Sequence, residues 1–258
     1  FFKQKTAYEI PKRDWSSDVC SSDLSLDFDA FFAGYDELLD YCGFAEMNHF
    51  GSRRLVGPNW KVSFDGYVDF YHLPILHKNT FGPDFPCDAL FHRVGPHQRV
   101  TGPRGPWAKL ESIPQDQWPD SVLTGGVWSI FPHASIAGFE IGEHKIYQVA
   151  RIFPGATADE SVTYLDFIST APLTDEFIET ANKQIAFLEM VVRDEDYATG
   201  LKIQRTVKTG AKKEFVFGRN EGGAQYVHGW LDALLETPDH ELSDLFRRGI
   251  SAGRLVTE

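Results

Sequence analysis

The segment Asn59–His77 reads NWKVSFDGYVDFYHLPILH and carries the most informative polar residues of the chain. Within it, Asp69, His72 and His77 form the pattern D-x2-H-x4-H. Two histidines at this spacing point about 140° apart on a regular helix and do not share a face. Pro74 stands between them, and we expect it to break the helix and let His77 turn back towards His72. The pattern is therefore compatible with one shared metal ion.

Helical and irregular stretches surround this segment. Residues 25–48 repeat aromatic and leucine side chains at helical spacing, which predicts a helix. A second helix is predicted over Asn59–Tyr71, ending near Pro74. Residues 83–119 are rich in Pro, Gly and His, so we expect mostly loop there, with room for an edge strand.

The middle of the chain has the composition of β-structure. Gly126–Phe139, His144–Phe153 and Ser161–Ser169 are rich in Val, Ile, Phe and Tyr, and turn residues separate them. We predict three antiparallel strands.

Helical periodicity returns after the strands. Thr174 can cap a long helix that continues to about Val207, and further helices are predicted over Glu221–Leu235 and Glu241–Arg248. Helices, then strands, then a long helix indicate an α+β fold. We expect an antiparallel sheet wrapped around the long helix, with a cavity between them.

Composition excludes several classes of protein. The net charge of −12 argues against a nucleic-acid partner, whose phosphates need a basic surface. No apolar run approaches the length of a membrane span. Cys42 and Cys87 are too few for a disulfide framework, which favours a cytoplasmic protein. The 21 Phe among 258 residues suggest a roomy apolar interior.

The first 24 residues, FFKQKTAYEIPKRDWSSDVCSSDL, resemble the translation of a sequencing adapter. We therefore expect residues 1–24 to be non-native and residues 25–258 to form one domain.

Three pieces of the chain together resemble the iron-site signature of Rieske-type ring-hydroxylating oxygenase α subunits. The pieces are NWK…D-x2-H-x4-H, Glu195-Asp196 followed by Gln204, and Asn220-Glu221…His228-Gly229-Trp230. They occur in the family's order and extend from Asn59 almost to the end of the chain. The resemblance implies the catalytic domain of such an enzyme and a helix-grip fold of the START and Bet v 1 type.

The resemblance also implies roles for individual residues. His72, His77 and Asp196 would form a two-histidine, one-carboxylate set for Fe(II), with open positions on the metal. Asp69 would be the bridging acid that passes electrons to this site and orients His72. Periodicity supports Asp196 only partly: Asp194 points roughly 160° away from it, so only one of the two can face the metal.

Four residues are expected to line the substrate cavity. Val192 and Leu188 lie one and two turns before the acid on the same helical stripe, and Asp65 and Val68 lie on the segment that carries the histidines. Phe64-Asp65 departs from the family, whose members usually have Glu-Asn there. This departure leaves the identity of the substrate open.

The resemblance implies two cofactors and several partners. Beside Fe(II), a Rieske 2Fe–2S cluster is expected in an N-terminal domain, but its Cys-x-His and Cys-x2-His motifs are absent from this sequence. We therefore expect that domain to be missing and the fragment to be inactive alone. A reductase, directly or through a ferredoxin, would supply electrons to a homotrimer, with or without a β subunit. O2 would then be used to hydroxylate or oxidatively demethylate an apolar, aromatic substrate.

Two other functions fit the same residues. A helix-grip domain could bind an apolar ligand without any metal. A zinc hydrolase could use the same three ligands, but it needs an acid–base carboxylate beside the metal, and Asp65 is the only candidate.

Overall fold

The structure is a computed structural model that describes residues 26–84, 87–102, 110, 112–118, 125–141, 144–211 and 215–250. The adapter-like residues 1–24 lie outside the described residues. No helix in the described part of the chain is long and apolar enough to cross a membrane.

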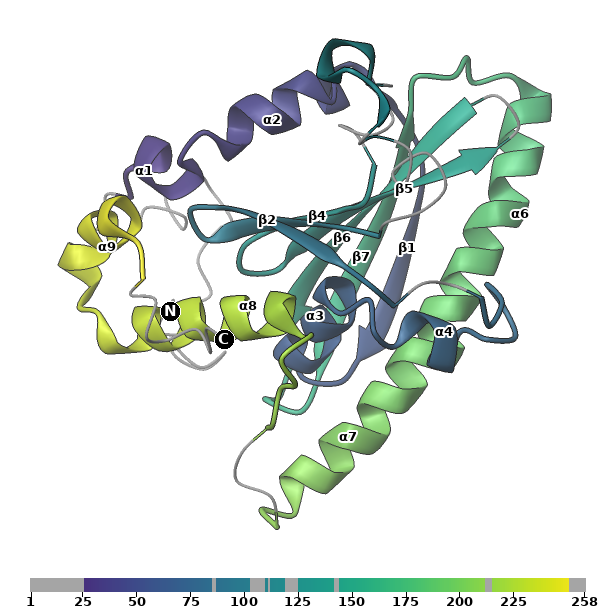
Figure 1. The fold of residues 1–258 in the computed structure, drawn as a ribbon. Coiled ribbons are helices and arrows are strands. Elements are labelled where there is room, and N and C mark those ends of the chain that lie inside the picture. The colour runs from purple at the N-terminus through teal and green to yellow at the C-terminus, as the bar shows by residue number, and fades with distance from the viewer. Residues whose placement is uncertain are drawn as a thin grey trace, which may run out of the picture.

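One antiparallel sheet organises the described chain (Figure 1). Its strand order within the described residues is β1-β7-β6-β5-β4-β3-β2. The strands are β1 (Asn48–Gly57), β2 (Leu90–Val94), β3 (His97–Thr101), β4 (Val127–Ile130), β5 (Ala134–Ile141), β6 (His144–Pro154) and β7 (Ser161–Ser169). The α+β class and the antiparallel sheet are confirmed, and the three predicted segments all form strands, but the sheet contains more strands than these three segments predicted.

The additional strands have identifiable sources. The predicted strand Gly126–Phe139 is two strands, β4 and β5, because the chain turns between Ile130 and Ala134. β2 is an edge strand within residues 83–119, where the sequence left room for one, and it forms a hairpin with β3, which was not predicted. β1 is an edge strand with few buried side chains, so it has little hydrophobic alternation for a sequence pattern to show.

The predicted helix over residues 25–48 is also divided. It comprises α1 (Phe28–Phe32) and α2 (Tyr35–Tyr41), followed by a short 3-10 turn, η2 (Phe44–Glu46). Ala33 and Gly34 separate the two helices with φ of 52° and 87°. Because a right-handed helix cannot continue through left-handed residues, the helix ends there.

The long helix begins and ends close to the predicted residues. Thr174 caps it by accepting a hydrogen bond from the Phe177 amide at 3.2 Å. It then runs as α6 (Asp175–Val191), the π-helical segment η5 (Val192–Tyr197) and α7 (Ala198–Lys208). The remaining helices are α3 (Trp60–Val68), α4 (Leu73–Leu76), η4 (Gln115–Gln117), α8 (Gly222–Glu236), η6 (Asp239–Glu241) and α9 (Leu242–Arg248).

Buried side chains pack on both faces of the sheet. On the inner face, Ala150 and Leu165 of the sheet contact a core that includes Ile185 and Leu188 of the long helix. On the outer face, Tyr35 of α2 packs in a cluster with Trp128 of β4. Figure 1 shows α6 and α7 along one side of the sheet and α1 and α2 on another. This is the predicted arrangement of a sheet folded about a long helix.

The packing of α7 against the start of α3 depends on a glycine. A Cβ at Gly200 would lie 2.7 Å from Cγ of Pro58, whose ring cannot rotate away. We expect Gly200→Ala to lower the free energy of unfolding by about 1–3 kcal/mol through overpacking. Gly66 of α3 has no atom within 4 Å of its virtual Cβ. Gly66→Ala should therefore stabilise by about 0.5–1 kcal/mol through helix propensity. Urea unfolding of both variants tests this, and equal effects would contradict the close contact.

Candidate metal centre

The segment that carries the two histidines changes direction just before His72. α3 ends at Val68, and Asp69 follows with an extended backbone, at φ −105° and ψ 115°. Oδ1 of Asp69 accepts a hydrogen bond from the Tyr71 amide at 2.6 Å, which stabilises the turn. Pro74 is not the breaking residue that the sequence suggested. It occupies the first turn of α4, where proline is tolerated because the first amides of a helix have no helical partner.

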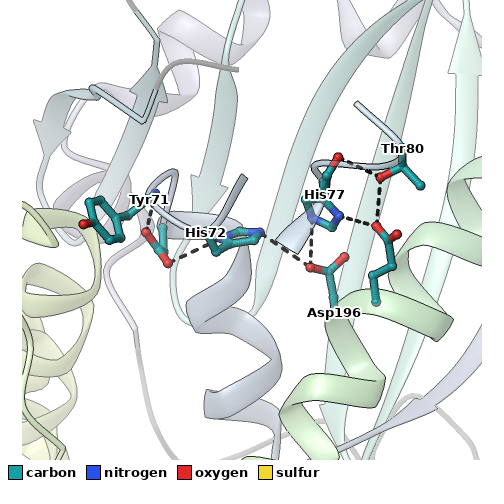
Figure 2. Close-up of polar contacts among 7 residues, drawn as sticks. Tyr71, His72, His77, Thr80 and Asp196 are labelled. Atoms are coloured by element: carbon teal, nitrogen blue, oxygen red, sulfur yellow. Dashed lines mark hydrogen bonds and ion pairs between the residues drawn. The ribbon is translucent and has the colours of Figure 1, made fainter. Parts of the chain in front are cut away.

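The two histidines cap the two ends of one short helix. His72 directly precedes α4 and His77 directly follows it, with their ring centroids 5.2 Å apart. Asp196 reaches both rings from η5: its Oδ1 lies 3.5 Å from Nε2 of His72 and 3.2 Å from Nε2 of His77 (Figure 2). The structure thus brings His72, His77 and Asp196 together, with one potential ligand atom of each within 4.8 Å of the others.

A carboxylate also faces the other nitrogen of each ring. Nδ1 of His77 donates to Oε2 of Glu195 at 2.6 Å, and the Thr80 hydroxyl donates to the same oxygen at 2.9 Å. Nδ1 of His72 lies 3.4 Å from Oδ2 of Asp69, at ion-pair distance. Such outer carboxylates fix the orientation of imidazoles that bind metals. Here they leave both Nε2 atoms directed at Asp196.

The π-helical segment explains why adjacent acids both reach the site. Glu195 and Asp196 contact the two different nitrogens of the His77 ring. Asp194 points elsewhere: it is about half exposed and is paired with Arg193 through two hydrogen bonds of 2.7 and 2.8 Å. The sequence pattern includes Glu195 but does not predict its contact with His77, because a regular helical period does not describe a segment with wider turns. An acid directly beside a candidate ligand was the available signal.

The cluster is strongly coupled electrostatically. Burial lowers the pKa of His72, but its contacts with Asp196 and Asp69 outweigh burial and raise the pKa to about 9. Burial also lowers the pKa of His77, but its contacts with Asp196 and Glu195 outweigh burial and raise the pKa. Burial raises the pKa of Asp196, but the two imidazoles hold it below its ordinary value.

A cavity of about 480 Å³ opens beside these residues. His72, His77 and Asp196 lie on its wall, and so do Leu188 and Val192, as the helical stripe predicted. The rest of the described lining is mainly apolar. Its aromatic members are Tyr67, Phe70, Phe81, Phe139 and Tyr197.

Two of the four predicted pocket residues lie elsewhere. Val68 is fully buried in the core formed with Phe64 and Trp230, because α3 packs closely on α8 at this point. Asp65 lies on a separate cavity of about 260 Å³ that adjoins Asp69, His72 and Asp196 from another side. Its carboxylate contacts Nε2 of His228 at 3.0 and 3.2 Å. Burial raises the pKa of Asp65, although His228 opposes the rise.

The donor set fits a divalent transition metal. Two imidazole nitrogens and one carboxylate oxygen converge, and both imidazoles are already oriented through their outer nitrogens. Two His and one carboxylate with open positions are the ligands typical of non-haem Fe(II). It is the only group of three or more His, Cys, Asp or Glu within the described residues that could hold such an ion.

The raised pKa of His72 predicts how the metal-free protein responds to pH. The pKa rises from 6.5 to about 9 on folding, so the stabilisation is complete below pH 6.5 and is lost as pH increases to about 9. With EDTA present, urea unfolding between pH 6 and 9 should show this decline, and His72→Ala should remove much of it. A wild-type profile as flat as that of His72→Ala would contradict the coupling.

Comparison with known proteins places this geometry in a family. The family model "Ring hydroxylating alpha subunit (catalytic domain)" matches residues 44–237. The apo quaternary ammonium Rieske monooxygenase CntA resembles the chain with a TM-score of 0.54 at 15% identity, over 88% of this chain and 54% of that one. An NdmA variant from Pseudomonas putida CBB5, solved with theobromine, gives 0.53 at 14% identity, over 82% and 56%.

The chain therefore spans little more than half the length of these structures. No curated protein matches it. The family model covers most of the chain, from the end of the N-terminal helices to the end of α8. The chain therefore belongs to the family of ring-hydroxylating α subunits and comprises their catalytic domain.

Proposed function

We propose that His72, His77 and Asp196 bind Fe(II) and that the chain is the catalytic domain of a Rieske-type oxygenase. The observation that carries this proposal is the convergence of two Nε2 atoms and one carboxylate oxygen on the wall of a largely apolar cavity. The metal would supply the redox chemistry by which dioxygen is activated beside a bound substrate. The family match supports the assignment to this class of enzyme.

The residues around the ligands keep them in place. Glu195 holds Nδ1 of His77 and is itself held by Thr80, so the ring cannot rotate without breaking two contacts. Asp69 has one oxygen on the Tyr71 amide and the other near His72. These contacts orient both imidazoles before any metal arrives, which reduces the entropy lost when the metal binds.

The cavity supports an apolar substrate. Phe70, Phe81 and Phe139 line it together with Leu188 and Val192, and aromatic faces favour a flat, aromatic ligand. The reaction would be hydroxylation or oxidative demethylation. CntA is a quaternary ammonium monooxygenase, and NdmA variants have been solved with theobromine and with caffeine, so the fold accommodates dissimilar ligands.

Electrons would reach the iron from a Rieske 2Fe–2S cluster supplied by a neighbouring subunit of a homotrimer. A cytoplasmic reductase, directly or through a ferredoxin, would reduce that cluster. Asp69 is suited to the connection because about a fifth of its side chain is exposed while it remains 3.4 Å from Nδ1 of His72. The role of Asp69 as the bridging acid is part of the proposal.

The metal assignment is tested by two matched acid-to-amide substitutions. Asp196→Asn should lower Fe(II) affinity at least tenfold because a charged ligand is lost. Asp194→Asn, two residues away on the same helix, should bind Fe(II) as the wild type does. Anaerobic Fe(II) titration with metal analysis measures both. A wild-type chain that binds no Fe(II) would favour the metal-free ligand-binding domain, and selective uptake of zinc would favour the hydrolase.

The bridging role of Asp69 is tested in the enzyme joined to its Rieske domain. Asp69→Ala should retain most of the bound iron, because Asp69 is not a ligand, but should slow oxidation of the reduced cluster at least a hundredfold. Stopped-flow spectroscopy with substrate and oxygen measures this rate. A variant that keeps its iron and oxidises its cluster at the wild-type rate would show that Asp69 has no such role.

A further inference from the structure

The smaller cavity, of about 260 Å³, reaches the metal centre from a different side than the substrate cavity. Asp69, His72 and Asp196 line both cavities, whereas Asp65 lines only the smaller one. Nε2 of His228 contacts both carboxylate oxygens of Asp65, at 3.0 and 3.2 Å. The Asp65–His228 pair therefore stands beside the metal centre without belonging to it.

The pair connects this cavity with the solvent. The side chains of Asp65 and His228 are 28% and 27% exposed. His228 lines neither cavity, so its exposed part faces the solvent outside them. Its ring packs against Phe217, with the ring centroids 4.9 Å apart, which helps to hold it beside Asp65. The cavity has room for several water molecules, through which a proton can move between Asp65 and the metal centre.

The proposed reactions consume protons as well as electrons. Hydroxylation or oxidative demethylation by one dioxygen takes up two electrons and two protons, and the electrons come from the reduced Rieske cluster. The acids and imidazoles on the described lining of the substrate cavity all belong to the metal centre. Its buried tyrosines, Tyr67 and Tyr197, are poor proton donors because burial raises the pKa of both. An apolar ligand there also excludes water, so protons need a second route.

Asp65 is better suited to hold a proton than the other acid that lines only the smaller cavity. Burial raises the pKa of Asp65, and the charge of Asp69 adds to the rise. The contact with His228 and the charge of Lys61 oppose it. Glu221 instead accepts a hydrogen bond from a backbone amide in the loop before α8. An acid whose pKa lies closer to the working pH is the more effective proton donor.

We propose that Asp65 and His228 form a proton-supply pair for the reaction at the metal centre. Asp65 gives the proton of its carboxyl to water in the smaller cavity, and that water passes a proton towards the metal centre as dioxygen is reduced. Nε2 of His228 then gives its proton to Asp65, and the other ring nitrogen takes one from the solvent. This inference rests on the proposed oxygenase and adds a role for a pair that binds no metal.

Infrared spectroscopy of the full chain tests the pair without iron or turnover. The folded chain should show a carboxylic-acid band of Asp65 that persists above the ordinary aspartate pKa of 3.8. The band should be absent from Asp65→Asn and should remain in Glu221→Gln, which removes the other acid of the same cavity. A wild-type chain without such a band above this pH would overturn proton storage on Asp65.

The rate is measured in the iron-loaded enzyme joined to its Rieske domain. Asp65→Asn preserves the shape of the side chain, and family members usually have Asn at this position, so the variant should fold and turn over. Its kcat should fall about tenfold, because protons then take slower routes, while KM stays within about twofold. The solvent isotope effect on kcat should increase to at least about twofold, since proton transfer becomes limiting. Glu221→Gln should behave as the wild type.

A double variant tests whether the two residues act as one unit. Because they act in series, Asp65→Asn combined with His228→Gln should be no slower than the slower single variant. Multiplied effects would overturn the pair, and so would an unchanged kcat and isotope effect in iron-loaded Asp65→Asn. A wild type that binds no iron or forms no product would contradict the oxygenase, whereas a wild-type rate in Asp65→Asn contradicts only the proton supply.

Discussion

The contact between Asp196 and the two histidine rings is the interaction on which the arrangement of the domain depends. It joins the long helix to the α3–α4 segment, two parts of the chain separated by most of the sheet. Without a metal, the opposite charges of the carboxylates and the imidazoles stabilise one another. Although burial acts in the other direction, these contacts raise the pKa of His72 and lower that of Asp196. The cavity exists between these two joined segments and the inner face of the sheet.

The parts of the fold that the sequence predicted are those with strong periodicity. β6 and β7 bury a regular series of side chains, and α6 buries one stripe formed by Phe177, Ala181, Ile185, Leu188 and Val191, so all three carry regular apolar patterns. β1 was missed because it lies at an edge with few buried side chains. An edge strand was allowed for in residues 83–119, where β2 lies, but its partner β3 was missed because the Pro- and Gly-rich surroundings resemble loop. Whether a short segment becomes a strand depends on the strand it pairs with, which the local sequence does not contain.

The sequence predicted which residues form the site more fully than it predicted where their side chains lie. The D-x2-H-x4-H spacing indicated the two histidines, but the turn occurs at Asp69 and not at Pro74. Val68 and Asp65 were expected on the cavity because they lie on the segment that carries the histidines, whereas the structure packs Val68 into the core and pairs Asp65 with His228. Departures from regular helical geometry therefore account for these errors.

The metal centre and the sheet wall of the cavity come from different parts of the chain. The residues that flank α4 supply the imidazoles and η5 supplies the carboxylate, whereas β5 and β6 supply Ala137 and Gln148. A side chain on the sheet wall can therefore change in size or polarity without moving any residue of the metal cluster. Substitutions on the strands can therefore change which compound the cavity accepts while the residues of the metal centre stay the same. This separation makes the domain adaptable during evolution.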